Sequence, residues 1–294
     1  MGAHSIAGAE GATRVHRASL MGSGCYTICS REASETTPSE PGHAMHQSSF
    51  KVIVVLPVFN EELNIGPLLD KLREHLTDSF LSYEVVVVDD GSTDRSAPIL
   101  EEYAGRQPLH ILRHRVNLGL GATLRDGLYY AGGIAGDKDI IVTMDADASH
   151  TPGLILRMVR MVREGHDVVI ASRYQAGSVV RGVTYHRRVI SWLGSFLMRV
   201  TFPIMGVRDY TCGYRAYVGG ALKAAMARYG ETFVDQDGFQ CMVDVLLKLR
   251  GMPLIFGEAP LILRYDFKQG ASKMRLGRTL VQTLRLLARR RMGR

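Results

Sequence analysis

Short, largely apolar runs that alternate with segments of helical periodicity constrain the fold of this chain more than any other feature. Each run is four to six residues long. Strands that are apolar on both faces are typical of a parallel sheet covered by helices on each side. The sequence therefore predicts an α/β fold with a mostly parallel sheet. The predicted strands are 51–56 (ending at Pro57), 85–88, 110–113, 140–144 and 168–171, and the predicted helices are 61–76, 94–103, 118–130 and 154–163.

The chain divides into three parts. Residues 1–49 are rich in Ser, Gly, Ala and Thr, show no period and are predicted to be a disordered extension, unless the chain truly starts at Met45. Residues 50–273 are predicted to form one domain, and residues 274–294 a basic amphipathic helix. Within the later part of the domain we expect helices at 189–201 and 238–249, a turn-rich segment at 208–217 and a strand near 254–256.

The charge of the chain is unevenly distributed. The formal net charge is +7, and residues 264–294 alone carry ten Lys or Arg and one Asp. Such a tail indicates an anionic partner, namely nucleic acid, phosphate groups or a membrane surface, although a solvated helix face explains it equally well. The four cysteines form no disulfide framework and suit a reducing, cytoplasmic compartment. No apolar run reaches the roughly eighteen residues that a membrane-spanning helix requires.

The carboxylates of Asp145 and Asp147 are the first candidates for chemistry. They follow Ile-Ile-Val-Thr-Met, where a central strand leaves the sheet. Ligands of such sheets bind beyond the carboxyl ends of the strands, and a hard cation such as Mg²⁺ or Mn²⁺ prefers oxygen ligands. That ion would offset charge on a departing nucleoside diphosphate. Ser149 and His150 could complete the ligand shell, and the alternative is an ordinary turn before Pro152.

Other clusters also follow strands, and each has a structural alternative. Asp90 could accept hydrogen bonds from a base or a ribose, while its neighbour Ser92 caps a helix. Phe59 could stack on a base, although segment 56–62 alone also fits a strand end followed by a helix start. The Gly-rich segment 117–122 lacks dinucleotide or P-loop spacing and resembles a tight turn. Guanidinium groups bind phosphates well or are ordinary surface charges. The candidates are Arg173, Arg187, Arg188, Arg208 and Arg215.

Taken in order, these segments resemble one known family. The motifs are Leu-Pro-Val-Phe-Asn-Glu-Glu, Val-Val-Asp-Asp-Gly-Ser-Thr-Asp, Asn-Leu-Gly-Leu-Gly-Ala, Met-Asp-Ala-Asp-Ala-Ser-His-Thr-Pro and Ala-Ser-Arg-Tyr, followed by Asp-Tyr-Thr-Cys-Gly-Tyr-Arg-Ala and Gly-Ala-Ser-Lys. They are similar to the family-two inverting glycosyltransferases with the GT-A fold, and within that family to dolichol- or polyprenol-phosphate mannose synthases. The resemblance covers about residues 50–280 and implies a GT-A glycosyltransferase domain over residues 50–273.

The resemblance implies a role for each matching residue. Asp147 and three later residues would be catalytic. Arg173 and Arg187 would grip the acceptor phosphate and the donor pyrophosphate, and Asp244 would orient the acceptor or an arginine. The residues implied to bind the nucleoside are Pro57, Phe59, Glu61 and Asp90, and those implied to bind the metal are Asp145, Asp147 and Ser149. Asp147, Arg173, Arg187 and Asp244 are implied to be catalytic, and Lys273 would close over the phosphates.

Three positions depart from the family pattern. Ser149 stands where Gln is frequent, and Asp244 stands where Glu is usual. Phe267 occupies a position that usually carries an Arg, so that Arg264 or Lys268 would have to supply its charge to the acceptor phosphate.

The implied reaction moves a hexose, with mannose from GDP-mannose favoured, onto a polyprenyl or dolichyl phosphate with inversion. That phosphate is already anionic near pH 7, so the site mainly has to offset repulsion between two anions. The alternative acceptor is a soluble metabolite or glycan. A nucleic-acid-binding protein is a third hypothesis, but it leaves the acidic strand ends unexplained; we therefore expect no nucleic-acid partner.

A peripheral position at the cytoplasmic membrane face is the expected location. The predicted C-terminal helix has an apolar stripe with arginines largely off it, which would suit an anionic bilayer or a separate membrane subunit. The helix at 189–201 could support a lipid tail. For both helices the alternative is ordinary packing. The stripe consists of Leu276, Leu280, Leu284 and Leu287, and the arginines are Arg275, Arg278, Arg285 and Arg289.

Overall fold

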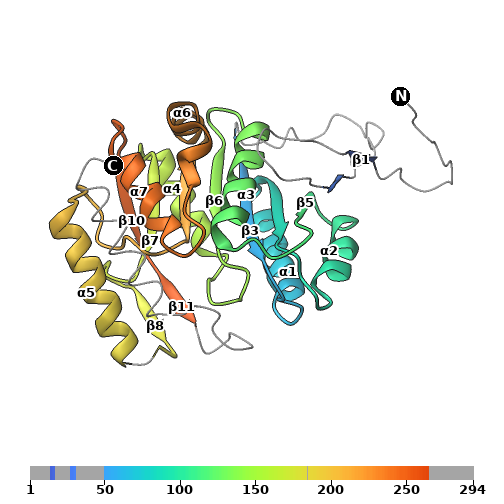
Figure 1. Cartoon of the computed structure of the whole chain (residues 1–294), viewed down its shortest axis with the longest axis horizontal. Helices are drawn as coiled ribbons and strands as arrows, with labels where there is room; N and C mark the ends of the chain where they lie inside the picture. Colours follow the sequence, from blue (N-terminus) through green and yellow to red (C-terminus); the bar gives the residue numbers. More distant parts are fainter. Residues whose placement is uncertain (1–13, 17–26, 31–49, 184, 265–294) are drawn as a thin grey trace.

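The computed structural model describes residues 14–16, 27–30, 50–183 and 185–264, which are built around one mixed sheet (Figure 1). Its strand order is β1-β2-β5-β4-β3-β6-β9-β7-β10, and β8 and β11 form a separate pair. The strands are β1 (Arg14–His16), β2 (Thr27–Ser30), β3 (Lys51–Val58), β4 (Ser82–Asp89), β5 (Leu109–Arg113), β6 (Ile140–Thr143), β7 (Val168–Ser172), β8 (Val179–Arg181), β9 (Arg215–Val218), β10 (Phe256–Pro260) and β11 (Ile262–Arg264).

Helices cover both faces of the sheet. α3 packs on β3 and β4, where a Cβ at Gly127 would lie 2.6 Å from Val55, and α6 packs beside α3. α1 and α2 cover the other face, because the crossovers from β3 to β4 and from β4 to β5 run along the sheet in the opposite direction to the crossover that contains α3. α4 lies on the same face as α1, since a Cβ at Gly153, just before α4, would lie 3.7 Å from the ring of His75 on α1. The helices are α1 (Ile65–Asp78), α2 (Ser96–Ala104), α3 (Leu120–Ile134), α4 (Leu154–Arg163), α5 (Tyr185–Thr201), α6 (Gly219–Tyr229), the short 3₁₀ helix η1 (Gly230–Val234) and α7 (Cys241–Arg250).

The structure confirms the α/β class and the mostly parallel sheet. Helix α4 coincides with its predicted range, and the first strands lie where the apolar runs predict them. Contrary to the expectation that Pro57 ends the first strand, β3 continues to Val58. The proline is tolerated because the β3–β6 ladder ends at Val55, so its missing N–H breaks no bond on that side.

Strand β9 is the main departure from the predicted topology. The sequence predicts only turns at 208–217, yet β9 begins at Arg215, inserts between β6 and β7, and runs antiparallel to both. Helix α6, which follows it directly, is also absent from the prediction. Four residues are too few to show a strand period among turn-forming neighbours, and the pairing with β6 spans more than seventy positions.

Parts of the two terminal predictions can be compared with the structure. Within residues 1–49, β2 pairs antiparallel with β5, and β1 pairs antiparallel with β2. The rest of that extension and the helix predicted at 274–294 lie outside the described residues. Within the described ranges, each helix is too short or too polar to cross a bilayer.

The strand order reverses next to β3, and this reversal positions the site. From β3 the chain proceeds outward through β4 and β5, and then crosses back to β6 on the opposite side of β3. Connections at such a switch point diverge and leave a crevice beyond the carboxyl ends of the strands. The predicted nucleoside and metal residues follow β3, β4 and β6, so they lie at the same edge of the sheet, around the switch point.

The glycine-rich segment joins the two halves of the domain at this edge. The amide of Gly121 donates to the carbonyl of Asp237 at 3.0 Å, and a Cβ at Gly121 would lie 1.8 Å from the carbonyl oxygen of Gln236. Gly119 has φ of 91°, which only glycine adopts readily. These glycines therefore permit a close backbone contact with the segment that precedes α7.

Replacing Gly121 with Ala is expected to destabilise the fold by about 1–3 kcal/mol, because the added methyl group overlaps a backbone carbonyl. Gly133 lies in the same helix and is a matched control, since a Cβ there meets nothing within 4 Å. Gly133→Ala should leave stability unchanged or raise it by up to about 1 kcal/mol. Urea unfolding measures both changes, and equal stability of the two variants would contradict the contact.

Candidate active site

Asp145 and Asp147 lie directly after β6 in a loop that turns at Ala148. Ala148 has φ of 59°, a left-handed conformation that reverses the chain. The amide of Asp145 donates to Nδ1 of His150 at 3.1 Å, and the His150 ring stacks on Tyr214 with ring centroids 4.9 Å apart. These contacts fix the loop, while the Asp145 side chain remains 39% exposed to solvent.

Ser149 orients Asp147. Its hydroxyl and its amide both donate to Oδ1 of Asp147, at 2.6 and 3.1 Å, and its side chain is buried. The residue predicted as a third metal ligand thus supports a carboxylate here. In the described part of the chain, no three His, Cys, Asp or Glu side chains group together as a metal site. Two carboxylates nevertheless fit a hard cation that takes its other oxygens from a diphosphate and water.

Arg215 fixes the backbone behind Asp145. A Cβ at Gly213 would lie 3.6 Å from Oδ1 of Asp145, so the loop that ends at Arg215 approaches the carboxylate closely. Arg215 is completely buried and donates to three backbone carbonyls at 2.7 to 2.9 Å. It therefore holds the loop and does not face a phosphate. Its acceptors are the carbonyl oxygens of Tyr210, Cys212 and Met242.

Hydrogen bonds join the loops after β3 and β4, where the nucleoside is predicted to bind. Asn60, with φ of 51°, donates its amide to Oγ of Ser92 at 3.0 Å and accepts the Thr93 amide at 2.8 Å. Oε2 of Glu61 accepts a hydrogen bond from the Asn64 side chain at 2.7 Å. These hydrogen bonds hold the two loops against each other. The other predicted nucleoside contacts at the end of β3 are half-buried Pro57 and Phe59.

Asp90 is buried beneath the loop that follows β5. Its Oδ1 accepts the amide of Leu118 and its Oδ2 accepts the amide of Gly119, each at 2.9 Å. Nδ1 of His114 lies 2.6 Å from the same Oδ1. Asp90 is only 3% exposed, and its carboxylate holds this loop in place through the two amides.

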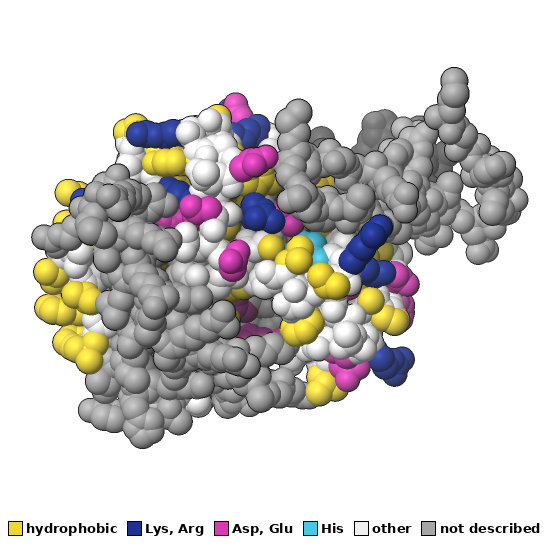
Figure 2. All heavy atoms as spheres, viewed as in Figure 1, with side chains coloured by type: hydrophobic (Ala, Val, Ile, Leu, Met, Phe, Trp, Pro, Cys, Tyr) yellow, Lys and Arg dark blue, Asp and Glu magenta, His cyan; other side chains and the backbone are white. Residues whose placement is uncertain are grey.

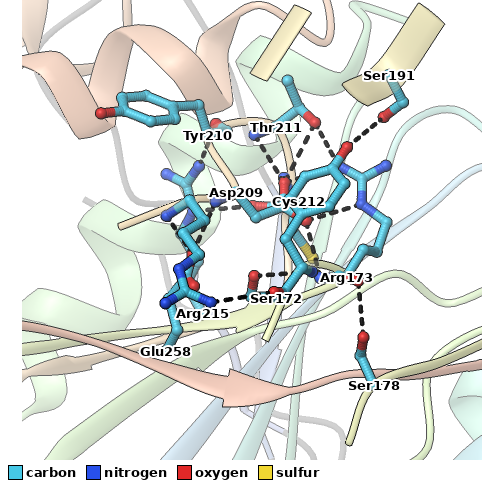
Figure 3. Close-up of polar contacts among 12 residues, drawn as sticks. Ser172, Arg173, Ser178, Ser191, Asp209, Tyr210, Thr211, Cys212, Arg215 and Glu258 are labelled. Atoms are coloured by element: carbon cyan, nitrogen blue, oxygen red, sulfur yellow. Dashed lines mark hydrogen bonds and ion pairs between the residues drawn. The ribbon is translucent and has the colours of Figure 1, made fainter. Parts of the chain in front are cut away.

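Arg173 forms a bidentate ion pair with Asp209 (Figure 3). Its Nε and Nη2 donate to the two carboxylate oxygens at 2.7 Å each, and Nη2 also contacts the Thr211 hydroxyl. Burial opposes ionisation of Asp209, but the guanidinium holds the pKa of this carboxyl below its usual value. Burial also opposes the charge on Arg173, but Asp209 raises the pKa of its guanidinium. Arg173 is thus a fixed cation, 22% exposed, beyond β7.

Glu258 of β10 positions the segment that carries Asp209 (Figure 3). Its Oε1 accepts the amides of Arg208 and Asp209 at 2.6 and 2.7 Å, and burial raises its pKa. Nη1 of Arg208 donates to the carbonyl of Tyr174 at 3.4 Å, so this candidate phosphate ligand contacts the backbone. A late strand therefore fixes the ion pair of Arg173.

Asp244 lies in a buried charged cluster on α7. Nζ of Lys248 is 2.5 Å from Oδ2 of Asp244 and 3.2 Å from Oδ1 of Asp235, and the Asp244 side chain is 1% exposed. Burial opposes ionisation of Asp235, but its contacts with the side chains of Asp244 and Gln236 and the positive charge of Lys248 lower its pKa to about 2. This environment fits a positioning role, because residues 235–237 contact the glycine-rich loop.

The side chains of two predicted residues, Arg187 and Lys273, lie outside the described part of the structure, and two residues near the site, His114 and Asp209, were not predicted. Arg187 lies in the first turns of α5, but its side chain is outside the described part, as is Lys273. The sequence suggests no role for His114 or Asp209. Asp209 opens the Asp-Tyr-Thr-Cys-Gly motif, which marks it as a candidate, but its partner lies 36 positions away. Sequence spacing alone does not reveal such a pair.

Comparisons with known proteins agree with this arrangement. The sequence profile of glycosyl transferase family 2 matches residues 53–224. The chain is 31% identical over 228 residues to the undecaprenyl-phosphate mannosyltransferase of Micrococcus luteus, covering 76% of this chain and 87% of that protein. It is 29% identical over 240 residues to the dolichol-phosphate mannosyltransferase of Pyrococcus furiosus, covering 81% of this chain but only 63% of that protein's length.

A solved structure shares the fold. Glucosyl-3-phosphoglycerate synthase from Mycobacterium tuberculosis, in complex with Mn²⁺, UDP-glucose and phosphoglyceric acid, superposes with a TM-score of 0.59. The two sequences are 20% identical, and the match covers 87% of this chain and 86% of the other. The shared architecture confirms the predicted GT-A type of fold, and the family profile makes the molecule a glycosyltransferase by class. The family profile spans more than half of the sequence, and the chain belongs to glycosyl transferase family 2.

Replacing Asp209 with Asn is expected to destabilise the protein by about 3–5 kcal/mol, because a largely buried guanidinium loses its counter-charge. Since Arg173 lowers the pKa of Asp209, the stabilisation by the pair is present above the ordinary Asp pKa of about 4 and is lost as pH falls through the folded-state value. Asp137→Asn is the control, because Asp137 pairs with Lys223 on the surface. Thermal unfolding should show no change for the control; similar losses for both would contradict the assignment.

Proposed function

We propose that this protein transfers a hexose from a nucleotide sugar to a polyprenyl or dolichyl phosphate with inversion at the anomeric carbon, and that GDP-mannose is its preferred donor. The observation that carries the proposal is the acidic pair, Asp145 and Asp147, beyond the switch point of a family 2 sheet. The two relatives support the acceptor class, because they are named as dolichol-phosphate and undecaprenyl-phosphate mannosyltransferases.

Asp145 and Asp147 would hold a divalent cation, Mg²⁺ or Mn²⁺. Carboxylate oxygens suit both ions, and the solved structure that shares the fold contains Mn²⁺ with UDP-glucose. When bound, the ion supplies charge stabilisation to the departing nucleoside diphosphate. Ser149 keeps the Asp147 carboxylate oriented through two hydrogen bonds, as outer contacts of a metal site commonly do.

The acceptor phosphate requires nearby cations more than a strong base. Its oxygen is already anionic and would attack the anomeric carbon as the bond to the diphosphate breaks. Arg173 supplies a permanent positive charge beyond β7, and Arg187 would supply a second from α5. Lys273 would close over the phosphates. Asp244 would act indirectly, by fixing the segment that contacts the glycine-rich loop.

A donor and acceptor screen tests the proposed reaction. The protein is incubated with labelled nucleotide sugars, Mg²⁺ or Mn²⁺, and either polyprenyl phosphate or phosphorylated soluble acceptors. Label from GDP-mannose is expected in the lipid extract. Label that appears only in a water-soluble product would favour the alternative, a transferase for a soluble metabolite or glycan. No transfer from any donor would overturn the proposal.

Replacing Asp147 with Ala is expected to lower transfer by on the order of 10²–10³-fold, because the leaving diphosphate loses charge stabilisation. The unfolding midpoint should change little, because the Asp147 carboxylate is partly exposed. Glu102→Gln removes a carboxylate that is 57% exposed on α2, and this control should retain full activity. Metal-dependent turnover that survives in Asp147→Ala would contradict the metal assignment.

An exposed apolar face on α5 supports a peripheral position at the membrane. Figure 2 shows hydrophobic side chains gathered at the left, over α5. Trp192 and Phe196 stack with ring centroids 5.5 Å apart and are 53% and 46% exposed. Such a face suits the interface of a bilayer that contains the acceptor lipid. The exposed side chains are Trp192, Leu193, Phe196, Leu197 and Val200.

Phe196→Glu is expected to weaken sedimentation with anionic vesicles and to slow transfer to a long-chain polyprenyl phosphate several-fold, because a charge enters the apolar face. Transfer to a short, water-soluble prenyl phosphate should be unchanged. Phe80→Glu is the matched control, because Phe80 is 75% exposed and follows α1, away from α5. Equal vesicle binding by both variants and the parent protein would exclude α5 as the membrane contact.

A further inference from the structure

His114 is a buried histidine that lies between two buried carboxylates. It follows β5, and its side chain is 1% exposed. Its Nδ1 is 2.6 Å from Oδ1 of Asp90, and its Nε2 is 3.0 Å from Oδ2 of Asp126. Ionised carboxylates only accept hydrogen bonds, whereas a neutral imidazole has a single N–H. An imidazole that bonds to both therefore donates with both nitrogens, as an imidazolium.

The surroundings favour the charged form of His114. Burial opposes its charge, but the hydrogen bonds to Asp126 and Asp90 outweigh burial and raise the pKa of His114 to about 9. Arg125 also faces this cluster, with its Nε 3.2 Å from Oδ1 of Asp126. Arg113, the preceding residue, is paired with other carboxylates. His114 is thus the cation that links the end of β4 to α3.

The carboxylate that His114 contacts determines the position of the glycine-rich loop. Asp90 accepts the amides of Leu118 and Gly119, one on each oxygen. Two residues later, Gly121 contacts the backbone of the segment before α7. A rotation of the Asp90 carboxylate would therefore break both amide hydrogen bonds and move the loop that borders the crevice.

We infer that His114, as an imidazolium, is a positioning residue for donor binding, which fixes the Asp90 carboxylate and through it the loop at residues 117–119. The inference rests on the proposed function and on the role in nucleoside binding that the family resemblance implies for Asp90. His114 is too deeply buried to contact the nucleotide itself. It therefore acts on the affinity for the nucleoside diphosphate portion of the donor and leaves the transfer step unaffected.

His114→Gln tests the inference, because glutamine keeps one donor but carries no charge. The affinity for GDP and UDP, measured by calorimetry with Mn²⁺ at pH 7, is expected to fall by about tenfold, as for the loss of one charge-assisted hydrogen bond. KM for the donor should rise while kcat is retained. His110→Gln is the matched control: His110 lies on β5 and contacts the carboxylate of Glu84 at 2.9 Å, but no bond links it to Asp90. The His110→Gln variant should bind GDP and UDP with the same affinity as the parent protein.

A pH profile separates positioning from simple structural support. Because the folded-state pKa of His114 is raised, its contribution is complete below the ordinary value of about 6.5 and is lost as pH rises through about 9. Nucleotide affinity of the parent protein should fall through that pH, whereas His114→Gln should lack this step. A folded variant with unchanged affinity, or with the same step, would overturn the inference.

Two further outcomes keep the test decisive. If His114→Gln does not fold, hydrogen exchange of the parent protein replaces it: the Leu118 and Gly119 amides should lose protection as pH passes about 9, and constant protection factors would overturn the inference.

Because the readout is nucleoside diphosphate binding, the test of His114 is independent of the acceptor. Normal His114-dependent binding without transfer to polyprenyl phosphate would overturn only the proposed function.

Discussion

The reversal of strand order beside β3 is the constraint on which the rest of the structure depends. Since β4 and β6 flank β3 and their connections leave in opposite directions, the backbone opens where the three strands end. The loops after these strands then carry Phe59, Asp90, Asp145 and Asp147 to one edge of the sheet, at its switch point. A sheet that progressed in one direction would separate them. The chemistry of the family therefore depends first on topology and only then on individual side chains.

Buried charges form the second level of organisation. Arg215 is satisfied by backbone carbonyls, Arg173 by Asp209, and His114 by two carboxylates. An uncompensated charge in such positions would be costly, so each pair fixes the geometry of the segments that it joins. These cations differ in solvent exposure: Arg215 is completely buried within the loop backbone, whereas the Arg173 side chain is partly exposed beyond β7.

Contacts between the halves of the domain make the site one unit. Gly121 in the first half meets the backbone before α7, and within the later half Glu258 on β10 accepts the amides of Arg208 and Asp209. The Gly121 contact joins segments more than a hundred positions apart, and the Glu258 contact joins β10 to the segment that carries the partner of Arg173. A change near the C-terminal strands can therefore alter the position of Arg173, and the first half and the later half of the domain are held in a defined relation.

Much of the first half of the domain was predictable, because its signals are local. Runs such as 85–88 are typical of strands buried on both faces of a covered parallel sheet, and the period of α4 appears within ten residues. Strand β9 was not predictable, because a four-residue run gains its stability from two neighbours distant in sequence. The contacts of Ser149 and Arg215 were not predictable either: the Ser149 hydroxyl donates to Asp147, and the Arg215 guanidinium donates to backbone carbonyls rather than to a phosphate.

The sequence by itself determined the fold class, the family and the acidic pair, because apolar periodicity and short motifs depend only on residues that are close together in the chain. Only the tertiary structure decided which charges face one another. The pairing of Arg173 with Asp209, the burial of Arg215 and the position of His114 between Asp90 and Asp126 depend on segments that meet through the sheet. The physical reason is that the cost of burying a charge depends on its neighbours in space, and no spacing in the sequence records them.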